Sequence, residues 1–482
     1  MKRLLLVFAL FVLALAGVGV FRAMQVKSRQ VPPGTPSAIA IDAARAADRL
    51  AAAISIPTVS WGDVSRRDAA AFTRFHDYLA SEFPNVARTL TREVVAEHSL
   101  LYTWTSAGTA PPIVLAAHLD VVPATDDGWT RPPFAGAVEA GRIHGRGALD
   151  DKAAVVGILE AIEALLARGF TPARRIYLAF GHNEEGGGDA SGAAAIAALL
   201  KARGVQNALL LDEGGLIYDR MPGVSQPVAL VGIAEKGYLN LELRVDAAGG
   251  HSSMPPRETA VGILARALDR LERQPMPAHL DGAARATFEH LAGDMSLPLR
   301  VVIANLAVTQ PLLVQRLAAS SETNALIRTT AAPTMLAGSQ KANVLATTAR
   351  AIVNFRLLPG DTIDSVTAHA SRAIGDPRVS LTVAAEGAAE ATPASPTNTP
   401  DFAALASSIR AVYPNVLVAP FLTIAATDAR HYRDVSSGTY RFLPIHQADA
   451  TTLMHGVNEY VTVDGYAQAI RFYATLIETL GR

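Results

Sequence analysis

The segment RGALDDK at residues 146–152 lies between two hydrophobic stretches that are typical of buried strands. The stretch before it, residues 113–119, carries His118 and is followed at once by Asp120. The stretch after it, residues 176–180, runs into an acidic pair at residues 184–185. An Ala/Leu-rich helical segment at 152–167 connects the two. Strands alternating with helices predict an α/β fold with a mostly parallel sheet flanked by helices.

Each of these strands ends in residues that bind metals or exchange protons. His118 and Asp120 end the first, Glu184 and Glu185 follow the second, and Asp150 lies in the segment between them. The carboxyl ends of parallel strands meet at one edge of a sheet, and histidine with carboxylates is a typical zinc ligand set. A lone histidine would be read as a buried, hydrogen-bonded side chain. The ordered set H-x-D, D-D-K and E-E favours a metal site instead.

Composition narrows the classes of protein. A chain of 482 residues predicts two domains, and a hydrophobic content of 50% excludes a disordered protein. A formal net charge of -1 predicts no broad basic face, so nucleic acid is not an expected partner. The absence of cysteine excludes disulfides and thiolate metal sites.

The N-terminus reads as an export or membrane segment. Basic residues flank an unbroken apolar run at residues 4–20, which is near the lower length limit for a spanning helix. We expect residues 1–22 to be a membrane anchor; a signal peptide cleaved near residues 14–16 is the alternative. Either interpretation predicts that the rest of the chain lies on the periplasmic or extracellular side, and that it is secreted if the segment is cleaved. Residues 23–37 then form a linker.

Several motifs between His118 and Val461 make the chain recognisable. They are AAHLDVVP, WTRPPFAGAVEAGRIHGRGALDDK, FGHNEEGGG, LLLDEGG, GGHSSMPP, NFRLLPGD, TDARHY and MHGVNEYV. In this order they resemble the zinc-dependent aminoacylase/carboxypeptidase metallopeptidase family, in particular its carboxypeptidase S and N-acyl amino acid hydrolase/synthase branch.

The alternation of apolar and polar residues at 238–245 predicts a sheet with one face exposed. With the helix and strands after it, this indicates a small α+β domain, and the resemblance implies a lid inserted into the catalytic domain. We therefore divide the body into a first catalytic part (38–236), a lid domain with a helical insert (237–386) and a second catalytic part (387–482). Residues 384–400 read as the return linker.

The resemblance implies two zinc ions per subunit. Asp150 would bridge them, His118 and Asp212 would complete one site, and Glu185 and His455 the other. Glu213 competes with Asp212, and we place the ligand at Asp212 because it ends its strand. His446 and His431 compete with His455, but only His455 lies in the H-G-x-N-E context of the family.

Five further residues receive roles. Asp120 would accept the imidazole N–H of His118 and orient it, and Glu184 would be the general base. By resemblance, His251 in the lid would polarise the scissile carbonyl or clamp the substrate; in some relatives this histidine crosses a dimer interface. Arg430 fits a clamp for a substrate carboxylate, and Asn343 a carbonyl contact.

These features predict a metal-dependent hydrolase that cleaves an amide or peptide bond next to a free carboxylate. It would be a carboxypeptidase or an N-acyl amino acid amidohydrolase that uses zinc-activated water. Two alternatives are a membrane-tethered binding protein of the same fold without turnover, and a reversible N-acyl amino acid synthase. The expected partners are a short peptide or N-acyl amino acid substrate, the membrane through the N-terminal segment, and a second subunit through the lid.

Overall fold

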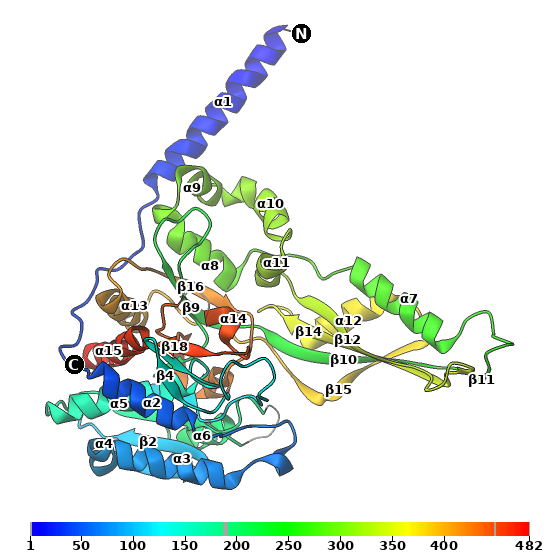
Figure 1. Cartoon of the computed structure of the whole chain (residues 1–482). Helices are drawn as coiled ribbons and strands as arrows, with labels where there is room; N and C mark the ends of the chain where they lie inside the picture. Colours follow the sequence, from blue (N-terminus) through cyan, green and yellow to red (C-terminus); the bar gives the residue numbers. More distant parts are fainter. Residues whose placement is uncertain (1, 187–190, 448–449, 482) are drawn as a thin grey trace.

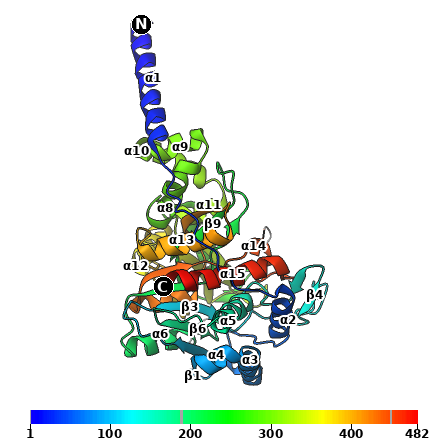
Figure 2. The same ribbon diagram turned by 90° about the vertical axis from the view of Figure 1, so that its left-hand side faces the viewer.

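The computed structural model describes residues 2–186, 191–447 and 450–481. A helix, α1 (Lys2–Gln25), projects from one end of the body, the catalytic sheet and its helices occupy the other end, and a narrow lid extends to one side (Figure 1). Both views place α1 clear of the body along most of its length (Figure 2).

The catalytic body is built on a nine-stranded sheet in the order β1-β2-β6-β3-β7-β17-β9-β16, with β8 paired to β9. The four central strands, β6, β3, β7 and β17, are parallel to one another. The strands are β1 (Thr91–Val95), β2 (Ser99–Trp104), β3 (Ile113–His118), β6 (Ile176–Gly181), β7 (Ala208–Asp212), β8 (Ile217–Tyr218), β9 (Val228–Glu235), β16 (Leu417–Thr423) and β17 (Ser436–Arg441).

Helices cover both faces of this sheet, which is why its central strands are continuous apolar runs. In β3, Ile113 and Leu115 face one hydrophobic core, whereas Val114 and Ala116 face the other. The first core is closed by α2 (Ala43–Ile54), α3 (Ala69–Glu82), α4 (Pro84–Thr89), α5 (Lys152–Ala167), α13 (Pro400–Val412) and α15 (Val463–Leu480), and the second by α6 (Ala193–Ala202) and the 3₁₀ segment η3 (Asp428–Asp434).

Local signals explain most helix boundaries. Asp42 and Asp68 cap α2 and α3 by accepting backbone N–H groups of the first turn. Pro84 begins α4, because proline is favoured in the first turn where its missing N–H costs nothing. Residues 84–89 are therefore helical, and β1 starts only at Thr91.

The lid is a four-stranded antiparallel sheet in the order β12-β14-β10-β15. Its helices α7 and α12 share a hydrophobic core with one face of this sheet, as the alternation in β10 predicts. The elements are β10 (Gly237–Asp246), β11 (Gly250–His251), α7 (Ala260–Arg273), β12 (Thr330–Ala337), β13 (Val344–Leu345), β14 (Thr348–Leu357), α12 (Ile363–Ile374) and β15 (Val379–Ala389).

The helical insert belongs spatially to the catalytic sheet. Its apolar residues, among them Leu291 and Leu306, share a core with Leu230 of β9 and Leu417 of β16. The insert comprises α8 (Gly282–Leu291), η2 (Ala292–Asp294), α9 (Leu297–Ala304), α10 (Leu306–Leu317) and α11 (Ser321–Ile327). The domain boundaries themselves remain predictions.

The two chain segments that connect the body with the lid lie side by side. The backbone N–H of Thr392 donates to the Glu235 oxygen at 3.1 Å, and that of Ser395 donates to the Ile233 oxygen at 2.7 Å. The return linker is shorter than expected, because β15 pairs with β10 as far as Ala389.

Smaller elements complete the body: η1 (Val64–Arg66), α14 (Ala450–Leu453), and a three-stranded sheet of β4 (Ala137–Glu139), β5 (Arg142–His144) and β18 (Tyr460–Thr462). Among the described residues, no single helix has both the length and the apolar character needed to cross a membrane; α9 and α10 have them only together, as a pair bent by 116°.

Candidate metal centre

Three neighbouring parallel strands end at one edge of the large sheet. β3 lies between β6 and β7. His118 closes β3, Asp212 closes β7, and Glu184 and Glu185 follow β6. Asp150 enters this edge from the turn before α5, so the strand order brings together residues that are far apart in the sequence.

His118 is buried and held in one orientation. Its Nδ1 lies 2.9 Å from the main-chain oxygen of Asp120, and its Nε2 lies 2.9 Å from Oδ1 of Asp150. Because a carbonyl oxygen can only accept, Nδ1 carries a proton, and Nε2 is the nitrogen that faces Asp150. A ring nitrogen this close to a carboxylate faces it through a positive species, either a second ring proton or a bound cation. Consistently, although burial opposes the charged ring, Asp120 and Asp150 raise the pKa of His118 well above its ordinary value.

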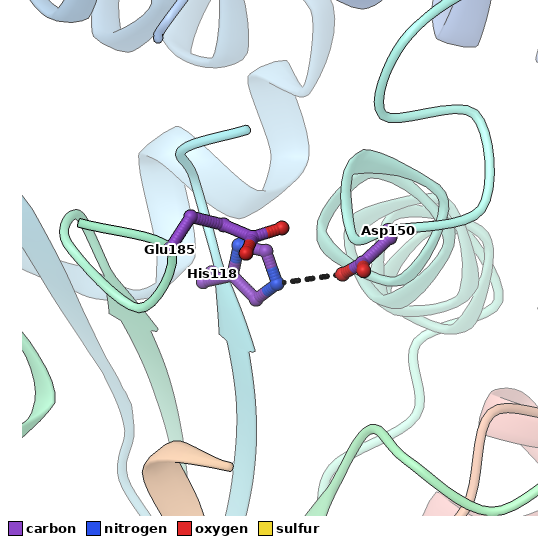
Figure 3. Close-up of side chains that lie close together, drawn as sticks. All are labelled: His118, Asp150 and Glu185. Carbon is purple, nitrogen blue, oxygen red and sulfur yellow. Dashed lines mark hydrogen bonds and ion pairs between the residues drawn. The ribbon is translucent and has the colours of Figure 1, made fainter. Parts of the chain in front are cut away.

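A second imidazole faces the other oxygen of the same carboxylate. His455 Nε2 lies 3.1 Å from Oδ2 of Asp150 and 2.9 Å from Oε1 of Glu185. Figure 3 shows His118, Asp150 and Glu185 converging from β3, from the turn before α5 and from the loop after β6. Within the described ranges these three form the group whose donor atoms all lie within 4.8 Å of one another.

Asp120 ties the end of β3 to the acidic loop. Its carboxylate accepts the backbone N–H groups of Glu184 at 3.2 Å and Glu185 at 3.1 Å. We expected this carboxylate to accept the imidazole N–H of His118. Its Oδ1 pairs with Nδ1 at 3.4 Å, and the main-chain oxygen of the same residue lies closer, at 2.9 Å. Asp120 therefore orients the ring through its carbonyl and its carboxylate, and the acidic loop through its carboxylate.

Two residues to which the sequence assigned no role hold the site together. Arg146 Nη1 donates to Oε2 of Glu459 at 2.5 Å, and both side chains are buried. Glu459 also accepts the backbone N–H groups of Gly147, Leu149 and Asp150 at 3.2, 2.7 and 3.2 Å. Both residues lie inside recognised motifs, Arg146 in the one that ends at Lys152 and Glu459 in MHGVNEYV, and this position was the signal that could have identified them.

The centre concentrates buried negative charge. Burial raises the pKa values of the carboxyls listed here, and neighbouring carboxylates raise them further: Glu184, Glu185, Asp212 and Glu213. A divalent cation in the group would favour their ionised forms. Imidazole and carboxylate donors gathered around Asp150 thus fit a metal of the zinc type.

The choice between Asp212 and Glu213 stays open. Asp212 is buried, and its Oδ2 makes no hydrogen bond within the described part of the chain. Burial raises the pKa of Asp212, and the charge of Arg441 lowers it. Burial also raises the pKa of Glu213, and the charge of Asp150 raises it further. Both acids therefore adjoin the centre, and the metal role assigned to Asp212 remains a prediction.

The competing histidines lie elsewhere. His446 Nε2 pairs with Oδ1 of Asp219 at 2.6 Å. His431 lies beside Arg430, whose Nε is 3.3 Å from the ring nitrogen Nε2. Of the three candidate histidines, His455 is the one that contacts Asp150.

Arg430 lies in η3, which packs against the end of β6. A Cβ added to Gly181 would lie 2.6 Å from Oδ2 of Asp428, so η3 approaches the strand that leads to Glu184. Asp428 also raises the pKa of Glu184, after burial. This position is compatible with a substrate-binding role for Arg430.

His251 and Asn343 are not brought to the centre of their own chain. They lie together at the tip of the lid, where β11 pairs with β13 and the Ser252 N–H donates to the Asn343 oxygen at 3.1 Å. The tip is exposed and lies at the far end of the lid from β18 and α14 (Figure 1). The Nδ1 of His251 contacts only a neighbour on its own turn, Ser253 Oγ at 2.8 Å, among the interactions described for it.

The sequence profile of peptidase family M20/M25/M40 matches residues 114–479. This chain belongs to that family. It is 40% identical over 443 residues to the N-fatty-acyl-amino acid synthase/hydrolase PM20D1 of Mus musculus, which covers 89% of this chain and 87% of that protein. It is also 40% identical over 441 residues to the probable carboxypeptidase S-like 2 of Dictyostelium discoideum, covering 90% and 84%.

Among solved structures, the M20 family metallo-carboxypeptidase Sso-CP2 from Sulfolobus solfataricus matches with a TM-score of 0.66 and 18% identity, covering 92% of this chain and all of that one. At this identity the likeness concerns the fold. The predicted family and the α/β fold with its large, mostly parallel sheet are confirmed. The M20 chain is a metal-dependent enzyme that hydrolyses amide or peptide bonds, so the binding-protein alternative is set aside.

Proposed function

We propose that this M20 enzyme releases an amino acid that has a free carboxylate, from short peptides or N-acyl amino acids, with two zinc ions per subunit. The observation that carries this proposal is the position of Asp150, whose two oxygens each face a different imidazole, that of His118 and that of His455. A carboxylate that pairs one oxygen with each of two histidines has the arrangement of a bridge between two cations.

The donors fall into two groups around that bridge. His118 with Asp212, or Glu213 in its place, would hold one ion, and Glu185 with His455 the other. When bound, zinc acts as a Lewis acid that activates water and polarises the substrate carbonyl.

The residues of the chain would bind the substrate and move the proton. Glu184 is the general base, because the hydrogen bond from its N–H to Asp120 fixes it beside Glu185 without engaging its own carboxylate. It would take the proton from the attacking water at a carboxylate oxygen and deliver it to the leaving nitrogen. Arg430 would hold the free carboxylate of the substrate by two parallel N–H bonds.

His251 and Asn343 would come from the lid of a partner subunit. The exposure of the lid tip and its distance from the centre of the same chain support this arrangement, and β12, at the edge of the lid sheet, is exposed along nearly its whole length. An unpaired sheet edge offers backbone groups to a second copy. The enzyme would then be a homodimer with shared sites.

The relatives support two substrate classes. One is named as a synthase/hydrolase of N-fatty-acyl amino acids and the other as a carboxypeptidase S-like protein. The same residues would serve condensation of a fatty acid with an amino acid, since substrate supply sets the direction. We also propose that α1 attaches the enzyme to a membrane with the catalytic body exported, on the basis of its apolar sequence and basic flanks.

The deciding experiment measures free amino acid released by the full chain from N-fatty-acyl amino acids and from dipeptides, with metal content determined on the same sample. We expect release that a chelator removes and zinc restores. Matched substrates in which the terminal carboxylate is amidated should be cleaved far more slowly. Equal cleavage of the amidated substrates would overturn the proposed carboxylate recognition, and activity that survives complete metal removal would overturn the metal centre.

A further inference from the structure

One end of the molecule presents apolar side chains where a surface helix normally carries polar ones. Val308 and Leu312, one turn apart on α10, have exposed fractions of 80% and 64%, and Leu297 at the start of α9 has 50%. We call these three exposed apolar residues of α9 and α10, Leu297, Val308 and Leu312, the apolar platform.

The inner faces of the same helices already fill the core of the insert. Ile303, Leu306 and Leu313 are buried against β9 and β16. A helix with one buried stripe is expected to be polar on its opposite face. In α9 and α10 both faces are apolar, so the outer one requires a second apolar environment or a partner.

Exposed basic residues lie on the same segments. The chain has no Asp or Glu before Asp42, and none between Asp294 and Glu322. Arg316 on α10, with Arg22 and Lys27 at the base of α1, is exposed to solvent. Two acids of the insert contact the segment after Lys27 and are paired there: Asp294 accepts from Ser28 Oγ at 2.8 Å, and Glu289 pairs with Arg29. An exposed apolar surface with cations beside it is complementary to a bilayer that contains anionic phospholipid, whose acyl chains accept the apolar side chains and whose headgroups accept the cations.

The platform is continuous with α1. Asn305, between α9 and α10, donates from Nδ2 to the Gly19 oxygen of α1 at 3.1 Å. Both views place α9 and α10 around the base of α1, at the end from which it projects (Figures 1 and 2). The apolar residues of α1, such as Leu13 and Phe21, are themselves exposed, at 67% and 63%.

We propose that α9 and α10 form a membrane-contact surface that lies in the interface of an anionic phospholipid bilayer, beside α1. The apolar platform enters the acyl boundary, and Arg316, Arg22 and Lys27 contact phosphate headgroups. The bend of 116° between α9 and α10 suits a pair of helices that lies along the interface. This inference concerns a surface separate from the catalytic centre and does not depend on the proposed substrate.

The experiment uses the absence of cysteine in the natural chain. The full-length variants Leu312→Cys and Val94→Cys are each labelled with an environment-sensitive fluorophore and reconstituted into phosphatidylcholine vesicles with phosphatidylglycerol. Val94 in β1 is the control, because its side chain is also exposed, at 52%, but β1 lies at the opposite end of the body from α9 and α10 (Figure 2). Nitroxide-labelled lipids report contact with acyl chains, and Leu13→Cys reports α1.

We expect lipid nitroxides to quench the label at position 312 and to leave the label at 94 largely unquenched. Adding Val308→Glu to the labelled Leu312→Cys chain should reduce this quenching, whereas adding Val94→Glu should not. Equal quenching at 312 and 94, with or without quenching at 13, would overturn the proposal. A label at 312 that is shielded without lipid, in a manner that rises with protein concentration, would show that a second copy covers the platform and would overturn it too. Amino acid release measured on the same samples keeps this result separate from the test of catalysis.

Discussion

Arg146 Nη1 donates to Glu459 Oε2 at 2.5 Å, and this buried pair joins the two segments that carry Asp150 and His455. Arg146 also donates from Nη2 to the main-chain oxygens of His455 and Gly456, at 3.2 and 2.9 Å. His455 has a φ of 58°, a left-handed conformation that costs a non-glycine residue free energy. The arginine thus stabilises the backbone that aims His455 at Asp150, and Glu459 fixes the turn from which Asp150 projects.

The first prediction concerns Glu459→Gln. Losing the charge that balances Arg146 and accepts three backbone N–H groups should lower the free energy of unfolding by about 3 kcal/mol. Because the pair orients ligands on both sides, zinc affinity should fall about 10- to 100-fold. Chemical denaturation and a competitive zinc titration measure the two effects.

Glu139→Gln is the matched control, since it removes a glutamate from an exposed pair with Arg131. A surface pair contributes about 0–1 kcal/mol, and this variant should bind zinc normally. Unchanged zinc affinity in a folded Glu459→Gln enzyme would show that the pair stabilises the fold without positioning the ligands.

The second prediction separates the two adjacent glutamates. Glu184→Gln should lower kcat by about 10³-fold with metal content unchanged, because only proton transfer is lost. Glu185→Gln should lower metal content, since Glu185 Oε1 lies 2.9 Å from His455 Nε2 among the proposed donors. Metal content and turnover are measured on the same samples of both variants. Loss of metal from Glu184→Gln would show that Glu184 is a metal ligand and not the general base.

The fold was largely predictable because its signals are local. The helix predicted at residues 152–167 is α5 with the same bounds, and the buried strands at 113–119 and 176–180 are β3 and β6, each within a residue of its limits. The packing of the helical insert was not predictable, since the apolar residues of α9 give no indication of which sheet they cover.

The part of the site that could be predicted lies on strands that follow one another in the sequence and are also neighbours in the sheet. His118, Asp150 and Glu185 converge because β6 and β3 are neighbours, as alternating strands and helices suggest. The contacts of Arg146 with Glu459 join segments 313 positions apart, and no local pattern encodes such a pairing. The location of His251 depends on how far the lid extends, which is a property of tertiary structure.

The third prediction concerns stability against pH. Lys236 is buried where the chain leaves β9 for the lid, and its Nζ donates to the oxygens of Ala325 and Arg328 at 3.0 and 2.8 Å. Burial lowers the pKa of Lys236 to about 7, against about 10.4 in an unfolded chain. Between these values the unfolded state binds a proton that the folded state does not, so this group makes stability rise with pH through that window and fall as pH drops towards 7.

Lys236→Met should therefore remove a slope of up to about 1.4 kcal/mol per pH unit from the free energy of unfolding above neutral pH. Denaturant titrations at several pH values measure it, and the slope is informative even if the variant is less stable throughout. Lys201→Met, at an exposed lysine paired with Asp434, is the control for removal of a lysine and should keep the wild-type slope. Coinciding slopes for Lys236→Met and wild type would refute the prediction.

The last prediction tests shared sites. His251→Ala and Glu184→Gln should each be nearly inactive alone. If the lid tip serves the partner subunit, mixed dimers combine an intact Glu184 centre of one subunit with an intact His251 of the other. An equimolar mixture after subunit exchange should then recover about one quarter of the wild-type activity, because half of the dimers are mixed and one of their two sites is complete. The control is a mixture of Glu184→Gln with a Glu184→Gln/His251→Ala double variant, which has no intact base and should stay inactive. No recovery in the first mixture, despite exchange demonstrated with tagged subunits, would mean that His251 acts within its own chain, and the lid would then have to move to bring it to Asp150.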